Sequence, residues 1–303
     1  MHPDGKSTVL LCNESNNSQF CGVDKAMALV AQNIMSFTTG LLARARLPKP
    51  LAILANRIFA KAFGINMSEA ASPLASYATI EDLFTRSLKP GVRGFEGPVC
   101  SPADGYLAMS APAESGRAIQ VKGLDYDLSE LVFGPNYQGG ERPEFAWYQT
   151  IYLAPHNYHR VHAPFNGLVR RITHRPGELW PVNSSFVRRI PRLFARNERL
   201  VFEFSPEHGG TAFVVMVGAF NVGRMVTPLA PGLVTNSAQR QWRPVVSELI
   251  LDPPSPVLIG DEIGTFMLGS TVVVIFDKAA INGLKLIEAQ DSRPVRVGQT
   301  FCG

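Results

Sequence analysis

The sequence predicts an α+β fold: a mainly antiparallel β domain preceded by an amphipathic helical extension. Three observations predict it. Near the N-terminus, apolar residues recur at helical steps of three and four. Farther along, short runs rich in β-branched and aromatic residues alternate with Pro and Gly, as in antiparallel sheets. The chain also has 303 residues, 46% of them hydrophobic, which is enough for one sizeable core.

The helical extension is predicted over residues 23–64, after a polar stretch at residues 1–22. A first apolar stripe consists of Met27, Val30, Ile34, Phe37 and Leu41. Pro48 and Pro50 interrupt the pattern, because proline fixes φ and lacks a backbone N–H. A second helix then resumes with Leu51, Leu54, Ile58 and Phe59. We place the extension at residues 1–65 and the β domain at residues 66–303.

The charges of this extension are all positive, since no Asp or Glu occurs between Lys25 and Ser68. The basic residues are Lys25, Arg44, Arg46, Lys49, Arg57 and Lys61. Basic amphipathic helices suit an anionic membrane surface. The alternative is that these helices pack on the protein's own core with their basic residues facing water. No apolar run is long enough to span a bilayer. We therefore expect peripheral attachment to the cytoplasmic side of the cell membrane.

The β domain is predicted to begin with a short helix over residues 79–88, with Thr79 as its N-cap. Strands follow at 99–109, 147–153, 167–174, 200–204, 211–218 and 271–276. The four cysteines form no CxxC pair, which favours a reducing compartment over a disulfide framework or a zinc site. The N-terminus lacks the pattern of a signal peptide. A net charge of +4 does not indicate a nucleic-acid partner.

Three histidines, His156, His159 and His162, lie at steps of three in YLAPHNYHRVHAPFNG. A strand would place His159 and His162 on opposite faces, and flanking prolines disfavour a helix that would align them. We therefore predict no metal site. Histidines that merely form hydrogen bonds within a loop are the other alternative.

Asp104 lies in SPADG at 101–105, where it is interpreted, taken alone, as a turn-capping residue. Ser270 follows Gly269 directly before a β-branched run. Asp, His and Ser together permit a triad in which Asp orients His and His deprotonates Ser. The G-x-S-x-G elbow is absent around Ser270, which disfavours a serine hydrolase of that type.

The segment NSSFVRRIPRLFARNERL at 183–200 carries five arginines against one acid, Glu198. Aromatic and aliphatic residues are interleaved with them. One interpretation is a basic, apolar lip that receives a phosphate headgroup and its acyl chains. The other is a solvated arginine-rich helix.

Four motifs in order resemble the bacterial phosphatidylserine decarboxylase proenzymes, a pyruvoyl-dependent family. They are SPADG at 101–105, YHRVHAPFNG at 158–167, LFARNER at 193–199 and LGST at 268–271. The resemblance extends from about residue 25 to 300 and includes the basic helical extension. LGST alone is weak evidence, whereas the ordered set is specific.

The resemblance implies that the chain cuts itself between Gly269 and Ser270. The products would be a β chain of residues 1–269 and an α chain of residues 270–303, capped by a pyruvoyl cofactor made from Ser270. The pyruvoyl carbonyl would serve as an electron sink during loss of CO2 from phosphatidylserine. Asp104 and His162 match the family's processing residues, and His159 matches the histidine of decarboxylation. A homo-oligomer at an anionic membrane is expected.

Three alternatives stay open at this point. The chain could decarboxylate a free amino acid or another serine-headed lipid. It could be a serine hydrolase that uses the same triad and keeps an intact chain. It could also be a non-catalytic β-rich binding module.

Overall fold

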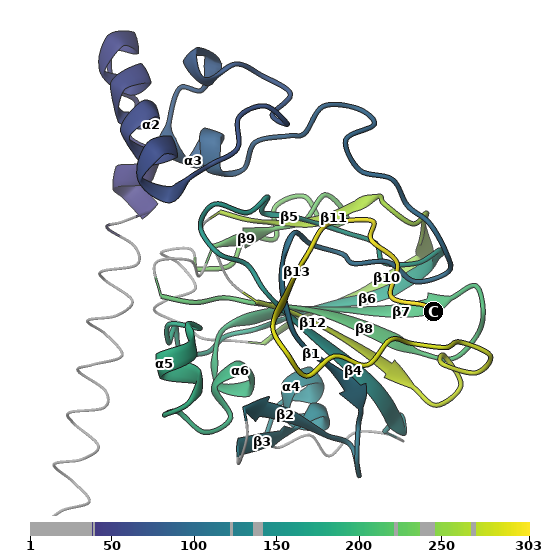
Figure 1. The fold of residues 1–303 in the computed structure, drawn as a ribbon. Helices are drawn as coiled ribbons and strands as arrows, with labels where there is room; N and C mark the ends of the chain where they lie inside the picture. Colours follow the sequence, from purple (N-terminus) through teal and green to yellow (C-terminus); the bar gives the residue numbers. More distant parts are fainter. Residues whose placement is uncertain are drawn as a thin grey trace, which may run out of the picture.

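The computed structural model of the chain describes residues 38, 40–121, 124–135, 142–220, 224–236, 246–267 and 271–303. An eight-stranded sheet forms its centre, in the order β10-β6-β7-β8-β12-β4-β1-β13 (Figure 1). Its strands are β1 (Gly105–Pro112), β4 (Phe145–Tyr152), β6 (Gly167–Arg175), β7 (Arg199–Pro206), β8 (Ala212–Val217), β10 (Ser247–Val257), β12 (Thr271–Asp277) and β13 (Arg293–Val295). Neighbouring strands pair antiparallel, so the predicted α+β class is confirmed.

Two layers cover the opposite faces of this sheet (Figure 1). A three-stranded sheet covers one face: β5 (Arg160–His162), β11 (Glu262–Phe266) and β9 (Met225–Val226). Short helices cover the other: α4 (Leu128–Phe133), α5 (Ser184–Val187) and α6 (Leu193–Arg196), beside the hairpin of β2 (Arg117–Val121) and β3 (Leu124–Asp127). Alternate residues of β12 supply the two cores, with Val272 and Val274 on the first face and Val273 and Ile275 on the second.

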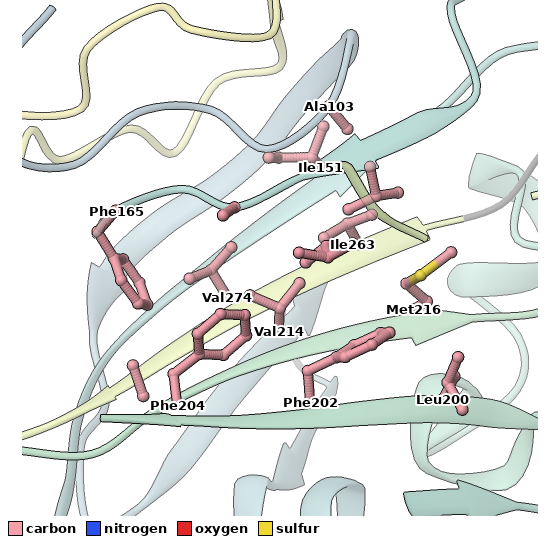
Figure 2. Packing of buried hydrophobic residues seen from close by; sticks show 14 of the residues in the cluster. Ala103, Ile151, Phe165, Leu200, Phe202, Phe204, Val214, Met216, Ile263 and Val274 are labelled. Carbon is pink, nitrogen blue, oxygen red and sulfur yellow. The ribbon is translucent and has the colours of Figure 1, made fainter. Parts of the chain in front are cut away.

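The first of these cores is the one against which the three-stranded sheet packs. Figure 2 shows Phe202 and Phe204 of β7 beside Val214 of β8 and Val274 of β12, with Ile263 of β11 above them. All five residues are fully buried. This packing fixes β11 over the central strands, and β11 is the strand that leads toward residues 268–270.

The predicted second helix exists as α2 (Lys49–Phe63), which begins two residues before Leu51 and includes Pro50. Pro48 is its N-cap and Pro50 lies in its first turn, where the missing N–H has no helical partner to lose. Gly64 ends it in the left-handed conformation at φ 69°. Among the described residues, no helix is long and apolar enough to cross a membrane. Most of the first predicted helix lies outside the described residues.

A small cluster joins α2 to the chain that follows it. Ala60, Ile65 and Leu83 form this cluster, with Phe59 and Met67 packed against it. The cluster includes the 3-10 turn Leu74–Ser76 and α3 (Ile80–Phe84), whose Thr79 cap accepts a hydrogen bond from Asp82 N at 3.0 Å. The predicted cap is therefore confirmed, but the helix ends at Phe84 and not at residue 88. This cluster contains residues from both sides of the predicted domain boundary between residues 65 and 66. The boundary itself stays a prediction.

The predicted strands all exist, with one shifted start. The segment predicted to begin at 99 becomes a strand only at Gly105, because residues 102–104 form bends. Gly105 is required there: a Cβ would lie 2.4 Å from the carbonyl oxygen of Tyr152 on the neighbouring strand. The sequence analysis missed β10 and β11 and also the short strands β2, β3, β5, β9 and β13.

Candidate active site

Asp104 ends the SPADG loop and lies almost buried, at 8% exposure. Its Oδ1 accepts hydrogen bonds from Val297 N at 2.8 Å and from Arg93 Nε at 3.1 Å, and its Oδ2 accepts from Arg93 Nη2. These partners are far from residue 104 in the chain. Interpreting Asp104 as a turn cap is therefore wrong, because its carboxylate binds remote groups. Arg93 also pairs with Glu69, which fixes the guanidinium between two carboxylates.

His162 ends β5 beside this loop, since its backbone N donates to Pro102 O at 2.8 Å. Its Nδ1 lies 2.6 Å from Gly260 O, and its Nε2 lies 3.0 Å from the Tyr158 hydroxyl. A carbonyl can only accept a hydrogen bond, so the neutral ring carries its proton on Nδ1. Nε2 then presents a lone pair to the Tyr158 O–H. Burial lowers the pKa of His162, which favours this neutral form.

Asp104 and His162 thus lie in one neighbourhood without a direct hydrogen bond between their side chains. The oxygen that holds Nδ1 of His162 belongs to Gly260, not to Asp104. Burial lowers the pKa of His162, and the Gly260 hydrogen bond and the charges of Glu262 and Asp104 oppose that shift, Asp104 least. The predicted orienting role of Asp104 is therefore not served by a direct contact with the ring, which Gly260 O fixes instead. The processing roles stay predictions.

His159 is fully buried and stacks on Phe84 of α3, with 3.9 Å between ring centroids. Its Nδ1 lies 2.9 Å from Asn157 O, so this ring also carries its proton on Nδ1 when neutral. Its Nε2 is a buried atom without a hydrogen-bond partner in the described chain. Burial lowers the pKa of His159 to about 3. His159 is therefore neutral, and its free lone pair belongs to a weak base, because this dry site disfavours the charged ring.

The cleavage site itself, Gly269–Ser270, lies outside the described residues. The residues on either side are placed. Phe266 N donates to His159 O at 3.0 Å, so the chain leading to the site runs beside the histidine strand. On the other side, Thr271 pairs with Val217 of β8 and Tyr152 of β4 in the middle of the large sheet. The Thr271 hydroxyl is buried and has no partner among the described residues.

No group of three or more metal-ligating side chains occurs among the residues that the structure describes. His159 and His162 each direct Nδ1 to a backbone carbonyl. Hydrogen bonds of this kind fix the ring orientation and leave Nε2 for chemistry. The two histidines are thus individually positioned by the backbone.

The arginine-rich segment does not form one solvated helix, and that alternative is wrong. It divides into α5 and α6, and three of its arginines are engaged in the fold. Arg192 pairs with Glu130, Arg196 pairs with Glu178, and the buried Arg199 donates to four backbone carbonyls. Arg188 and Arg189 are exposed. The exposed arginines of the predicted basic lip are therefore these two and Arg192, which is exposed but paired with Glu130.

Sequence analysis missed Tyr158, Arg93 and Gly260 as parts of this site. Tyr158 stands in the YHRVH motif, and its position beside two histidines was the available signal. Arg93 and Gly260 carry no such signal. They lie 11 residues from Asp104 and 98 from His162, so only the folded chain brings them there.

Comparisons with known proteins agree with the motif resemblance. The family model described as phosphatidylserine decarboxylase matches residues 80–303. A phosphatidylserine decarboxylase proenzyme of Acidovorax ebreus (strain TPSY) is 38% identical over 91% of this chain and 95% of its own. The proenzyme of Anaeromyxobacter sp. (strain K) is 38% identical over 83% and 88%. That of Shewanella putrefaciens (strain CN-32) is 39% identical over 90% and 94%.

Proposed function

The chain belongs to the phosphatidylserine decarboxylase family, and we propose that Ser270 supplies the pyruvoyl group with which it converts phosphatidylserine to phosphatidylethanolamine and CO2. The observation that carries this proposal is the strand β5, which ends at the half-buried His162 and directly follows the fully buried His159. It pairs with β11, the strand leading to Gly269–Ser270, and it contacts the Asp104 loop. The α and β chains would both come from this one proenzyme.

The described residues around position 270 fit a pyruvoyl group. Thr271 Oγ1 and His159 Nε2 are buried polar atoms without partners among the described residues, and they belong to residues that flank the site or lie beside the chain leading to it. Burial without a partner costs free energy, so a polar group arriving there would be stabilised. When present, the pyruvoyl carbonyl supplies the electron sink that loss of CO2 requires.

His162 is the base that we assign to self-cleavage. A serine hydroxyl is a weak nucleophile and must lose its proton to attack the Gly269 carbonyl. His162 Nε2 has the lone pair to receive that proton, and Gly260 O stabilises the charged ring through Nδ1–H. The Tyr158 hydroxyl now occupies this lone pair at 3.0 Å. The Ser270 hydroxyl would either displace the Tyr158 hydroxyl from this lone pair or pass its proton to His162 through the Tyr158 hydroxyl.

His159 is the residue that we assign to proton transfer during decarboxylation. In the arrangement described, its Nε2 is unprotonated. It must therefore first accept a proton, and with a pKa of about 3 it can do so only once the negative charge of the bound substrate raises that pKa. It would then donate that proton to the carbon that has lost CO2. The stacked Phe84 ring and the Asn157 carbonyl hold the imidazole in one orientation throughout.

The helical extension supports peripheral attachment to an anionic membrane. The buried residues of α2 are Ala52, Asn56 and Ala60, so its narrow, small-residue face packs on the protein. Its larger residues Leu51, Leu54 and Ile58 are 50–60% exposed, with exposed Lys49, Arg57 and Lys61 on the same helix. A helix that exposes its apolar residues suits a bilayer surface better than a core. The cytoplasmic side and a homo-oligomer remain part of this proposal.

Self-cleavage is tested by intact mass and a denaturing gel of the purified chain. We expect two chains, the smaller holding the 34 residues from 270 to 303. Its first residue should resist Edman sequencing and be reduced by borohydride. Ser270→Ala is the control, which should stay in one piece without activity. An intact wild-type chain that fully decarboxylates phosphatidylserine would refute the proposal, and an intact chain that hydrolyses esters would favour the hydrolase alternative.

A further inference from the structure

A second feature of this site is a cavity between the end of α2 and the large sheet. Its volume is ≈ 220 Å³. Gly64 and Asn66 line it from the end of the helix, and Tyr106 lines it from β1. At about 30 Å³ for each water molecule, it could hold roughly seven. It therefore suits a small headgroup fragment and is too small for acyl chains.

Arg86 lines this cavity and is buried at 4% exposure. Its Nη2 donates to His156 O at 3.0 Å and to Asn157 O at 3.3 Å. Its Nε and Nη1 are buried and have no hydrogen-bond partner among the described residues. A guanidinium keeps its charge in proteins, and a buried charge is costly unless an opposite charge contacts it. The residue thus has two donor groups without an acceptor among the described residues.

Both carboxylates that line the cavity, Glu69 and Asp104, already form ion pairs with other arginines. Arg93 binds both Glu69 and Asp104, and Arg296 lies 3.3 Å from Glu69. Three arginines therefore face two carboxylates in this cavity. Asp104 and Glu69 influence Arg86 only through their field, with no ion pair to it in the described chain. Arg86 is the cation of the cavity that still lacks a counter-charge.

We propose that Arg86 binds the phosphodiester of the lipid headgroup in this cavity. The proposal rests on the function proposed above. An oxyanion matches the two free N–H groups and the missing charge. The substrate's carboxylate is the poorer candidate, because an ion pair with a buried guanidinium would stabilise the carboxylate that must leave as CO2. The cavity is lined by Gly64, the residue that ends α2.

The test uses processed, full-length protein and calorimetric binding of sn-glycero-3-phosphoethanolamine, which has the phosphodiester without acyl chains. Ethanolamine, which lacks the phosphate, is the matched ligand. Arg86→Met should weaken binding of the phosphodiester by at least about tenfold and leave ethanolamine binding unchanged, since hydrogen bonds to charged groups are strong. Arg117→Met is the control variant, because Arg117 pairs with Asp125 on an exposed hairpin and should change nothing. Arg86→Lys, which keeps the charge with fewer donors, replaces Arg86→Met if that variant does not fold.

Equal phosphodiester affinity in wild type and in a folded, cleaved Arg86 variant would overturn the proposal. So would inorganic phosphate that binds through Arg86 as tightly as the phosphodiester while KM for phosphatidylserine stays unchanged in the variant. That second result would mean a site for free phosphate. If the wild type binds the phosphodiester through Arg86 but releases no CO2 from phosphatidylserine, the proposed function fails and the cavity assignment stands.

Discussion

The helix α2 and the strand β12 are both rich in large apolar residues, yet they place them in opposite environments. Residues 272–276 of β12 are all fully buried between two layers. In α2, the buried residues are two alanines and an asparagine, while Leu51, Leu54 and Ile58 remain half exposed. Hydrophobicity in a sequence therefore indicates that a segment avoids water, but not which surface covers it. In β12 that surface is the protein, and in α2 we propose a membrane.

The same substitution in the two regions should give the largest contrast. Val274→Asp would bury a carboxylate without a partner in β12. That costs several kcal/mol, a large part of the roughly 5–15 kcal/mol that stabilises a domain. Leu54→Asp should change the free energy of unfolding by about 0.5 kcal/mol or less, because the residue is exposed. Thermal melting checks both variants. We expect Val274→Asp to be unfolded and uncut.

Liposome sedimentation then tests whether the exposed apolar residues of α2 bind a membrane, in contrast to the apolar residues of β12 that stabilise the fold. Leu54→Asp should bind anionic vesicles roughly ten to a hundred times more weakly, since it removes a buried leucine and adds a repelled charge. Deleting residues 1–64 is a blunter test, because Phe59 and Ala60 belong to the cluster under α3. If Leu54→Asp unfolds the protein, α2 packs on the protein's own core and the membrane assignment is wrong.

The second comparison is between His159 and His162, which both lie in the sheet region and to which we assign different chemical steps. His162→Ala should leave the chain uncut, because Ser270 then lacks its base, and Asp104→Asn should slow or prevent cleavage. His159→Ala should still cut but decarboxylate about 10²- to 10⁴-fold more slowly. A gel measures cleavage and CO2 release measures turnover, with thermal melting as the control for folding. Cleavage by the His162 variant and none by the His159 variant would exchange the two assignments.

The pH dependence of stability should show the smallest effect. Burial lowers the pKa of His159 to about 3, whereas an unfolded histidine titrates near ~6.5. The unfolded chain therefore binds the proton first as the pH falls. The stability present above about pH 6.5 should be lost progressively toward about pH 3, by up to about 2 kcal/mol between about pH 6.5 and pH 5.

Urea unfolding at about pH 7.5 and pH 5 measures this effect. His162 adds to it in the same direction, because burial also lowers its pKa. His159→Gln, which cannot take the proton, should flatten the dependence. An equally steep dependence in that variant would place the titrating group elsewhere. The helix α2 contains no histidine. We therefore expect vesicle binding by the folded protein not to follow the pH dependence of stability.

Part of the site could be predicted from the sequence because its residues stand in short motifs. The YHRVH and SPADG segments located His159, His162 and Asp104, and LGST located Gly269–Ser270. The motifs did not reveal the partners of these residues. Tyr158 stands inside the YHRVH motif, but its contact with His162 was not predicted. Gly260 and Arg93 reach the site from other segments, and Arg86 does so across 70 residues. No local pattern encodes such distant contacts.

By itself, the sequence determined the local structure. Pro48, Pro50 and Gly64 set the limits of α2, Thr79 capped α3, and β-branched runs marked the central strands. These features depend on the backbone preferences of a few neighbouring residues. The tertiary structure alone decided which face of α2 is covered, and it placed Asp104 on Arg93 and Val297. It also left His159 Nε2 and Arg86 Nε without hydrogen-bond partners in the part of the chain that the structure describes. The physical reason is that burial and charge compensation depend on every segment that packs around a group, and those segments are distant in the chain.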